Sequence, residues 1–79
     1  TEERRVDLVK RSKVEAENAK VSIRSARKDV NDDIKKLGKD GLPEDVVKDA
    51  ESSVQKLTDS HIVKVDTILK DKEVEIMTI

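Results

Sequence analysis

Apolar residues recur at a helical interval through the first half of the chain. They return every seven residues, with further apolar residues between them: Val9, Ala16, Ile23, Val30, Leu37, Ala19, Ala26 and Ile34. Spacings of three, four and seven residues place side chains on one face of an α-helix. No Gly or Pro interrupts residues 2–37, so the pattern predicts one helix over about 2–37, roughly 54 Å long. Thr1, followed by Glu2 and Glu3, suits the N-cap of this helix.

A short connection separates this helix from a second one. Gly38 suits the left-handed position that follows a helix, Gly41 suits a turn, and Pro43 suits the first position of the next helix. We expect a turn over 38–42 and a helix over about 43–77, with this apolar stripe: Val47, Ala50, Val54, Leu57, His61, Ile62, Val65, Ile68, Leu69 and Ile76. Because the connection is short, the two helices should pack as a long antiparallel hairpin in a single all-α domain.

The apolar stripe of the second helix is wider than one partner helix can cover. Ile62 and Ile68 lie beside the line that runs from Leu57 to Val65. Such a face requires a third helix or a second copy of the chain. We favour a chain that holds two helices of a three-helix bundle. Because so small a core is marginal alone, we expect two copies to pair through the uncovered face.

Composition excludes several classes of site. The chain has 79 residues, of which 44% are charged and none is Phe, Tyr, Trp or Cys. Without Cys there is no disulfide, thiolate zinc site or cysteine nucleophile. Without aromatic residues there is no platform for stacking single-stranded bases. No apolar run approaches the ~20 residues that span a bilayer, and His61 is the only histidine. We therefore expect no metal, no cofactor and no catalytic residue.

Charge is distributed unevenly between the two halves. Residues 1–41 carry twelve Lys and Arg against nine Asp and Glu, a net +3, whereas residues 42–79 carry five against nine, a net −4. On the first helix, a row of cations falls within roughly 80° of arc: Lys13, Lys20, Arg24, Arg27 and Lys35. Lys28 adjoins this row. Such a row on a rigid helix could bind a phosphate backbone or could be an ordinary solvated face, and spacing alone favours the solvated face.

Several segments closely resemble the C-terminal part of the bacterial ribosome recycling factor family. The resemblance covers essentially the whole chain in order and is carried by Thr1–Arg5, Glu15–Arg24, Arg27–Asp29, Gln55–Asp59 and Lys70–Met77. It implies a three-helix bundle with a smaller β-rich domain inserted between its first and second helices. On that plan this chain holds the second and third helices. The first helix and the inserted domain are absent from it.

The resemblance also implies a function. Recycling factors are not enzymes; they bind large-subunit rRNA on the post-termination ribosome and split the subunits together with elongation factor G. We expect a cytoplasmic location, and the sequence does not distinguish it from an organellar one. The family's arginine cluster falls on Arg24 and Arg27, with Lys28 where a second adjacent arginine is common and Lys20 at a further basic position. These four residues are the predicted rRNA-binding residues, Arg27 foremost. Neither membrane nor DNA is an expected partner.

Two consequences of this resemblance concern the chain by itself. Since the chain lacks the inserted domain, we expect it to be inactive in recycling when alone. The alternative function is a generic helical-hairpin or coiled-coil module that binds another protein and uses its cations only for solubility. The two hypotheses differ in whether Arg24 and Arg27 are needed for binding.

Overall fold

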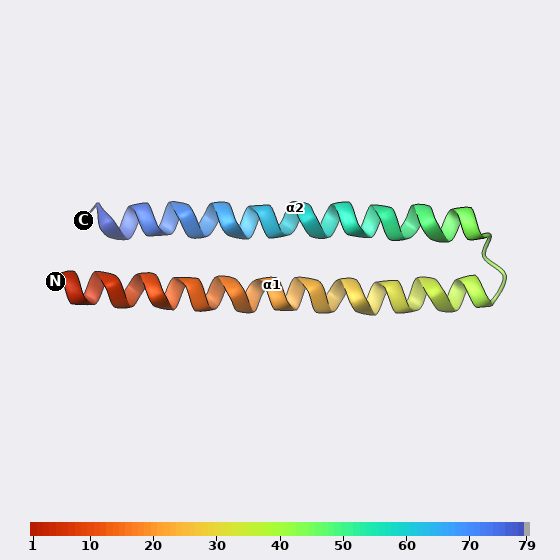
Figure 1. Ribbon diagram of the computed structural model, residues 1–79, viewed down its shortest axis with the longest axis horizontal. Coiled ribbons are helices and arrows are strands. Elements are labelled where there is room, and N and C mark those ends of the chain that lie inside the picture. Colours follow the sequence, from red (N-terminus) through yellow and green to blue (C-terminus); the bar gives the residue numbers. More distant parts are fainter. Residues whose placement is uncertain (79) are drawn as a thin grey trace.

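The computed structural model describes residues 1–78 and consists of two long antiparallel helices (Figure 1). Helix α1 spans Glu2–Lys39 and helix α2 spans Glu44–Met77. The start of α1 and the end of α2 lie side by side at one end of the hairpin, and the connection lies at the other (Figure 1). The Cα trace of the molecule extends 61 × 15 × 8 Å along the three principal axes. The prediction of an all-α antiparallel hairpin is confirmed.

Local sequence explains where each helix begins. The Thr1 hydroxyl accepts a hydrogen bond of 3.3 Å from the backbone N–H of Arg4, which confirms Thr1 as the N-cap of α1. Helix α2 begins at Glu44, directly after Pro43. Pro43 has an extended backbone conformation, with φ of −55° and ψ of 143°, and is the N-cap of α2. The sequence predicts it as the first residue of the helix, so the helix starts one residue later than expected. Acidic residues fill the first turn of both helices, where they interact favourably with the helix dipole.

Helix α1 ends in a Schellman motif centred on Gly41. Gly41 has a φ of +112°, and the N–H of Leu42 donates to the carbonyl of Leu37 at 2.9 Å. The prediction that Gly38 would take the left-handed position was wrong, and α1 runs two residues beyond its expected end. Gly38 stays inside the helix, where a Cβ atom would lie 3.2 Å from Cγ2 of Val47. Its lack of a side chain allows the helices to approach closely.

Replacing Gly41 with Ala should lower the free energy of unfolding by about 1 kcal/mol, because an L-residue with a Cβ is strained at positive φ. Nothing lies within 4 Å of the added Cβ, so the loss would report backbone strain and not a clash. Urea denaturation followed by circular dichroism would measure it. Gly41→Asn is the control and should lose less, since Asn tolerates this conformation better. Equal stability of Gly41→Ala and the native chain would contradict the positive φ of Gly41.

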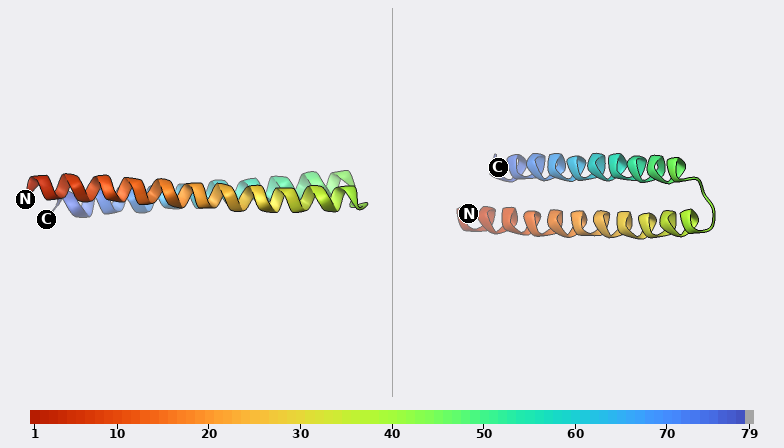
Figure 2. Two further views of the ribbon diagram at one scale, coloured as in Figure 1. Left: turned by 90° about the horizontal axis from the view of Figure 1, so that it is seen from below. Right: turned by 45° about the vertical axis from the view of Figure 1, so that its right-hand side comes forward.

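The helices meet along a thin seam and cross at a shallow angle (Figure 2). From α1 the buried and half-buried positions are Arg5, Val9, Ser12, Ala16, Lys20, Ile23, Arg27, Asn31, Ile34 and Gly38. From α2 they are Val47, Ala50, Glu51, Val54, Thr58, Ile62, Val65, Leu69, Glu73 and Ile76. Within residues 1–78, only Ile34 and Thr58 are buried, with 8% and 5% of their surface still exposed. The core is therefore one row of contacts deep.

An open groove runs along one side of the seam and is lined by seam residues together with exposed apolar residues beside them. Leu57 and Ile68 are each 61% exposed, and Val30 is 43% exposed. What is called here the apolar groove comprises two hollows. One is lined by Ser12, Glu15, Ala16, Ala19, Val65, Ile68, Leu69 and Lys72, and the other by Ile23, Ala26, Arg27, Val30, Val54, Leu57, Thr58 and His61. The stripes predicted from the sequence are thus divided between the seam and this uncovered groove.

Candidate nucleic-acid interface

The four predicted rRNA-binding residues occupy a little over two turns of α1 and are called here the basic cluster: Lys20, Arg24, Arg27 and Lys28. Their spacing of three and four residues, without a break in the helix, places them along one side. The structure divides them into two kinds. Lys20 and Arg27 are half-buried in the seam, whereas Arg24 and Lys28 are exposed.

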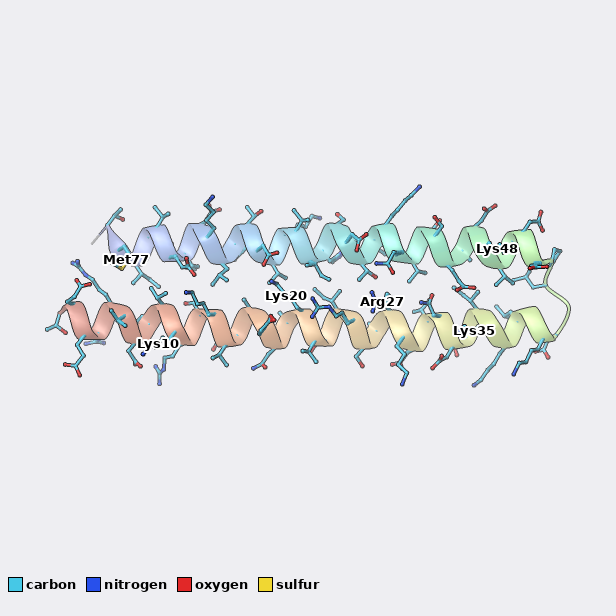
Figure 3. The ribbon with its side chains drawn as sticks, in the orientation of Figure 1. Lys10, Lys20, Arg27, Lys35, Lys48 and Met77 are labelled. Atoms are coloured by element: carbon cyan, nitrogen blue, oxygen red, sulfur yellow. The ribbon has the colours of Figure 1, made fainter. Side chains whose placement is uncertain are left out.

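Lys20 forms an ion pair with α2. Its side chain is only 18% exposed, and its Nζ contacts the carboxylate of Asp66, which is 53% exposed. In Figure 3 Lys20 lies between the two helices. A carboxylate directly against the ammonium offsets its charge. Lys20 therefore joins the helices and adds little net positive charge to the surface.

Arg27 also reaches toward α2, but its partner is neutral. Its Nη1 donates to Oε1 of Gln55 at 3.4 Å, and Nε2 of Gln55 donates to Oδ1 of Asp59 at 2.9 Å. Figure 3 shows Arg27 between the helices, near the middle of the hairpin. A guanidinium carries more N–H donors than this single bond uses, so Arg27 retains donors for an anion.

Arg24 and Lys28 form the exposed part of the basic cluster. Within residues 1–78, neither side chain makes an ion pair or a hydrogen bond. Lys13 and Lys35, also exposed, continue the row of cations toward the two ends of α1. A phosphate backbone lying along this side of α1 would meet Arg24 and Lys28 first, with Arg27 beside them at the seam.

The exposed residues Arg24 and Lys28 lie on the opposite side of the seam from the apolar groove, whereas Arg27 lies at the seam and borders the groove. Successive residues of a helix are rotated by about 100°, so Ala26 and Lys28 project to opposite sides of Arg27. Ala26 lines the apolar groove, and Lys28 belongs to the exposed cations. A helix that covered the groove would therefore leave Arg24 and Lys28 accessible.

Sequence reasoning missed the α2 partners Gln55, Asp59 and Asp66. The position of the connection could have predicted these partners. In an antiparallel hairpin, the numbers of two residues that face each other add up to a nearly constant value. Here that sum is about 83, since Lys39 ends α1 and Glu44 begins α2. Lys20 and Arg27 should then face α2 near residues 63 and 56, within a turn of the partners that they contact.

Other candidate chemistry finds no support in the described residues. The Nδ1 atom of His61 lies 2.9 Å from the carbonyl of Leu57 on the same helix, and His61 borders the apolar groove. Residues 1–78 contain no group of three or more His, Cys, Asp or Glu side chains that could hold a metal ion. Neither α1 nor α2 has a stretch long and apolar enough to cross a membrane.

Comparison with known proteins identifies relatives along the whole chain. The family model described as Ribosome recycling factor matches residues 1–77. The chain is 61% identical over 79 residues to the ribosome-recycling factor of Flavobacterium psychrophilum and 57% identical over 79 residues to that of Flavobacterium johnsoniae. It is 52% identical over 80 aligned positions to that of Bacillus subtilis. All of this chain is covered in each case, and it spans 42–43% of the length of these relatives.

Proposed function

The chain belongs to the ribosome recycling factor family, and on that premise we propose that it carries an rRNA-binding surface of such a factor. The proposed contact is the basic cluster against phosphates of large-subunit rRNA on the post-termination ribosome. The observation that carries it is the exposure of Arg24 and Lys28 on a rigid helix, with Arg27 held beside them and the apolar groove on the other side.

The chemistry of the cluster favours recognition of the RNA backbone. Arg24 and Arg27 can each bind a phosphate bidentately, whereas Lys28 supplies charge without the planar fork. The chain has no aromatic residue on which a base could stack. Recognition of duplex RNA by shape and phosphate contacts needs neither base stacking nor base edges, and its affinity falls steeply with salt.

The activity of the whole factor extends beyond this region. We assign binding to this chain and subunit splitting to the complete protein, acting with elongation factor G in the cytoplasm. GTP hydrolysis then belongs to that partner, and the chain is not an enzyme. The name of these relatives, ribosome-recycling factor, supports this assignment, and the chain spans 42% of the length of the relative from Flavobacterium psychrophilum. By itself the chain should bind without splitting subunits.

The apolar groove is a second element of the proposal. In the complete factor a further helix would cover it and complete a three-helix bundle. In the isolated chain we propose that a second copy covers it. The accessible surface is 6217 Å², whereas a compact protein of this mass exposes about 4,800 Å². The hairpin therefore exposes about 1,400 Å² more than a compact protein of its mass, an area similar to that which a specific protein interface buries.

Co-sedimentation with purified large ribosomal subunits across a salt series tests the rRNA contact. Arg24→Ala should weaken binding about tenfold and make the salt dependence shallower by roughly one phosphate contact. Arg11→Ala is the matched control, because it removes a guanidinium from the same helix about 140° away around its axis. Equal effects of the two variants would contradict the proposal and favour the protein-interaction module.

A further inference from the structure

The hydrogen-bonded chain from Arg27 through Gln55 to Asp59 crosses from α1 to α2. We propose that Gln55 and Asp59 are positioning residues, which orient the Arg27 guanidinium for its phosphate contact. Helix α2 would thus contribute to an RNA-binding surface whose cations all lie on α1. This inference rests on the proposed function, and it assigns a role to residues that touch no RNA themselves.

Asp59 determines which end of the Gln55 amide faces Arg27. A guanidinium is only a donor, so its partner must be the carbonyl oxygen of the amide. Gln55 Nε2 donates to Asp59 at 2.9 Å, one helical turn along α2, which directs Oε1 toward Arg27 at 3.4 Å. Without the carboxylate the amide can turn over and present its NH₂ group, a donor, to another donor.

The neutral amide also preserves the charge of Arg27. Lys20 lies directly against the carboxylate of Asp66, which offsets its charge. Arg27 instead donates to the uncharged amide oxygen of Gln55, and the Asp59 carboxylate contacts Gln55 and not Arg27. Arg27 is therefore oriented but not neutralised. A long side chain that is already ordered loses less rotamer freedom when it binds an anion.

Substitutions at Asp59 separate orientation from charge. Asp59→Asn and Asp59→Ala each remove one negative charge, but only Asn keeps an oxygen that can accept from Gln55. If charge alone mattered, both variants would bind large ribosomal subunits equally and slightly more tightly than the native chain. We expect Asp59→Ala to bind about threefold more weakly than Asp59→Asn, since it loses one ordering hydrogen bond.

Two controls keep this comparison specific. Ala is a better helix former than Asn, so lost helix stability would produce the opposite order, and thermal unfolding by circular dichroism measures it. Asp71, an exposed carboxylate on α2, provides the matched pair Asp71→Asn and Asp71→Ala, which should bind equally. In an Arg27→Ala background the difference between the two Asp59 variants should disappear.

The outcomes distinguish this inference from the proposed function. Equal binding by the two Asp59 variants, while Arg24→Ala and Arg27→Ala each weaken binding, overturns the positioning role alone. A difference that persists in the Arg27→Ala background overturns it too, because Asp59 would then act by another route. No binding by a native chain that is confirmed to be helical overturns both.

Discussion

Replacing Arg24 and Arg27 together with Ala should weaken binding to large ribosomal subunits by at least ~100-fold at moderate salt. Each guanidinium would make a charge-assisted hydrogen bond to phosphate, and such bonds contribute about 1.5–3 kcal/mol each. The double variant should also flatten the logarithmic salt dependence of the affinity by roughly two phosphate contacts. Co-sedimentation across a salt series measures both quantities. The slope of the salt dependence is more specific than the loss of affinity, because it is proportional to the number of phosphate contacts.

The matched control for this double variant replaces Arg4 and Arg11 with Ala. It removes two guanidinium groups from the exposed side of α1 away from the basic cluster and gives the same net charge. It should bind within about twofold of the native chain, since surface charges beyond a Debye length are largely screened. Equal losses in the two double variants would mean that net charge, and not the basic cluster, determines affinity.

Much of the fold follows from the sequence because each helix is built on an uninterrupted periodic pattern with a clear start. Thr1 with Glu2 and Glu3 determined the N-terminus of α1 as expected. The C-terminus was harder, since Gly38 and Gly41 both suit the left-handed position. The structure gives that position to Gly41, because Gly38 is needed where α1 passes close to Val47. That contact is between helices and cannot be obtained from local pattern alone.

The candidate site was only partly predictable for a related reason. Periodicity places Arg27 relative to other residues of α1, but it does not place α2. The apolar pattern suggests a seam made of apolar residues, yet Lys20 and Arg27 lie in it. Their long aliphatic stems can pack between helices while the charged ends reach polar partners. Those partners, Asp66 and Gln55, become visible only when the antiparallel register is known.

Replacing Leu57 and Ile68 together with Asp should convert the proposed dimer of the isolated chain into monomers. Both side chains are 61% exposed in the single hairpin and would be buried in a groove-to-groove dimer. Burying a Leu or Ile contributes about 1.5–3 kcal/mol, and each substitution occurs twice in the dimer. The dissociation constant should therefore rise by roughly 1,000-fold or more, before the cost of burying the carboxylates is added. Sedimentation equilibrium over a range of concentrations measures it.

Val63 and Val74 provide the matched control for the groove variant. They are 61% and 58% exposed on the same helix, but they lie on the side of α2 away from the groove. Their double replacement with Asp should leave the dimer intact, because the substitutions would remain in water. A native chain that is monomeric and stably helical would overturn the dimer. Because the groove and the exposed cations lie on opposite sides of α1, a groove variant that stays helical should also keep its affinity for large subunits.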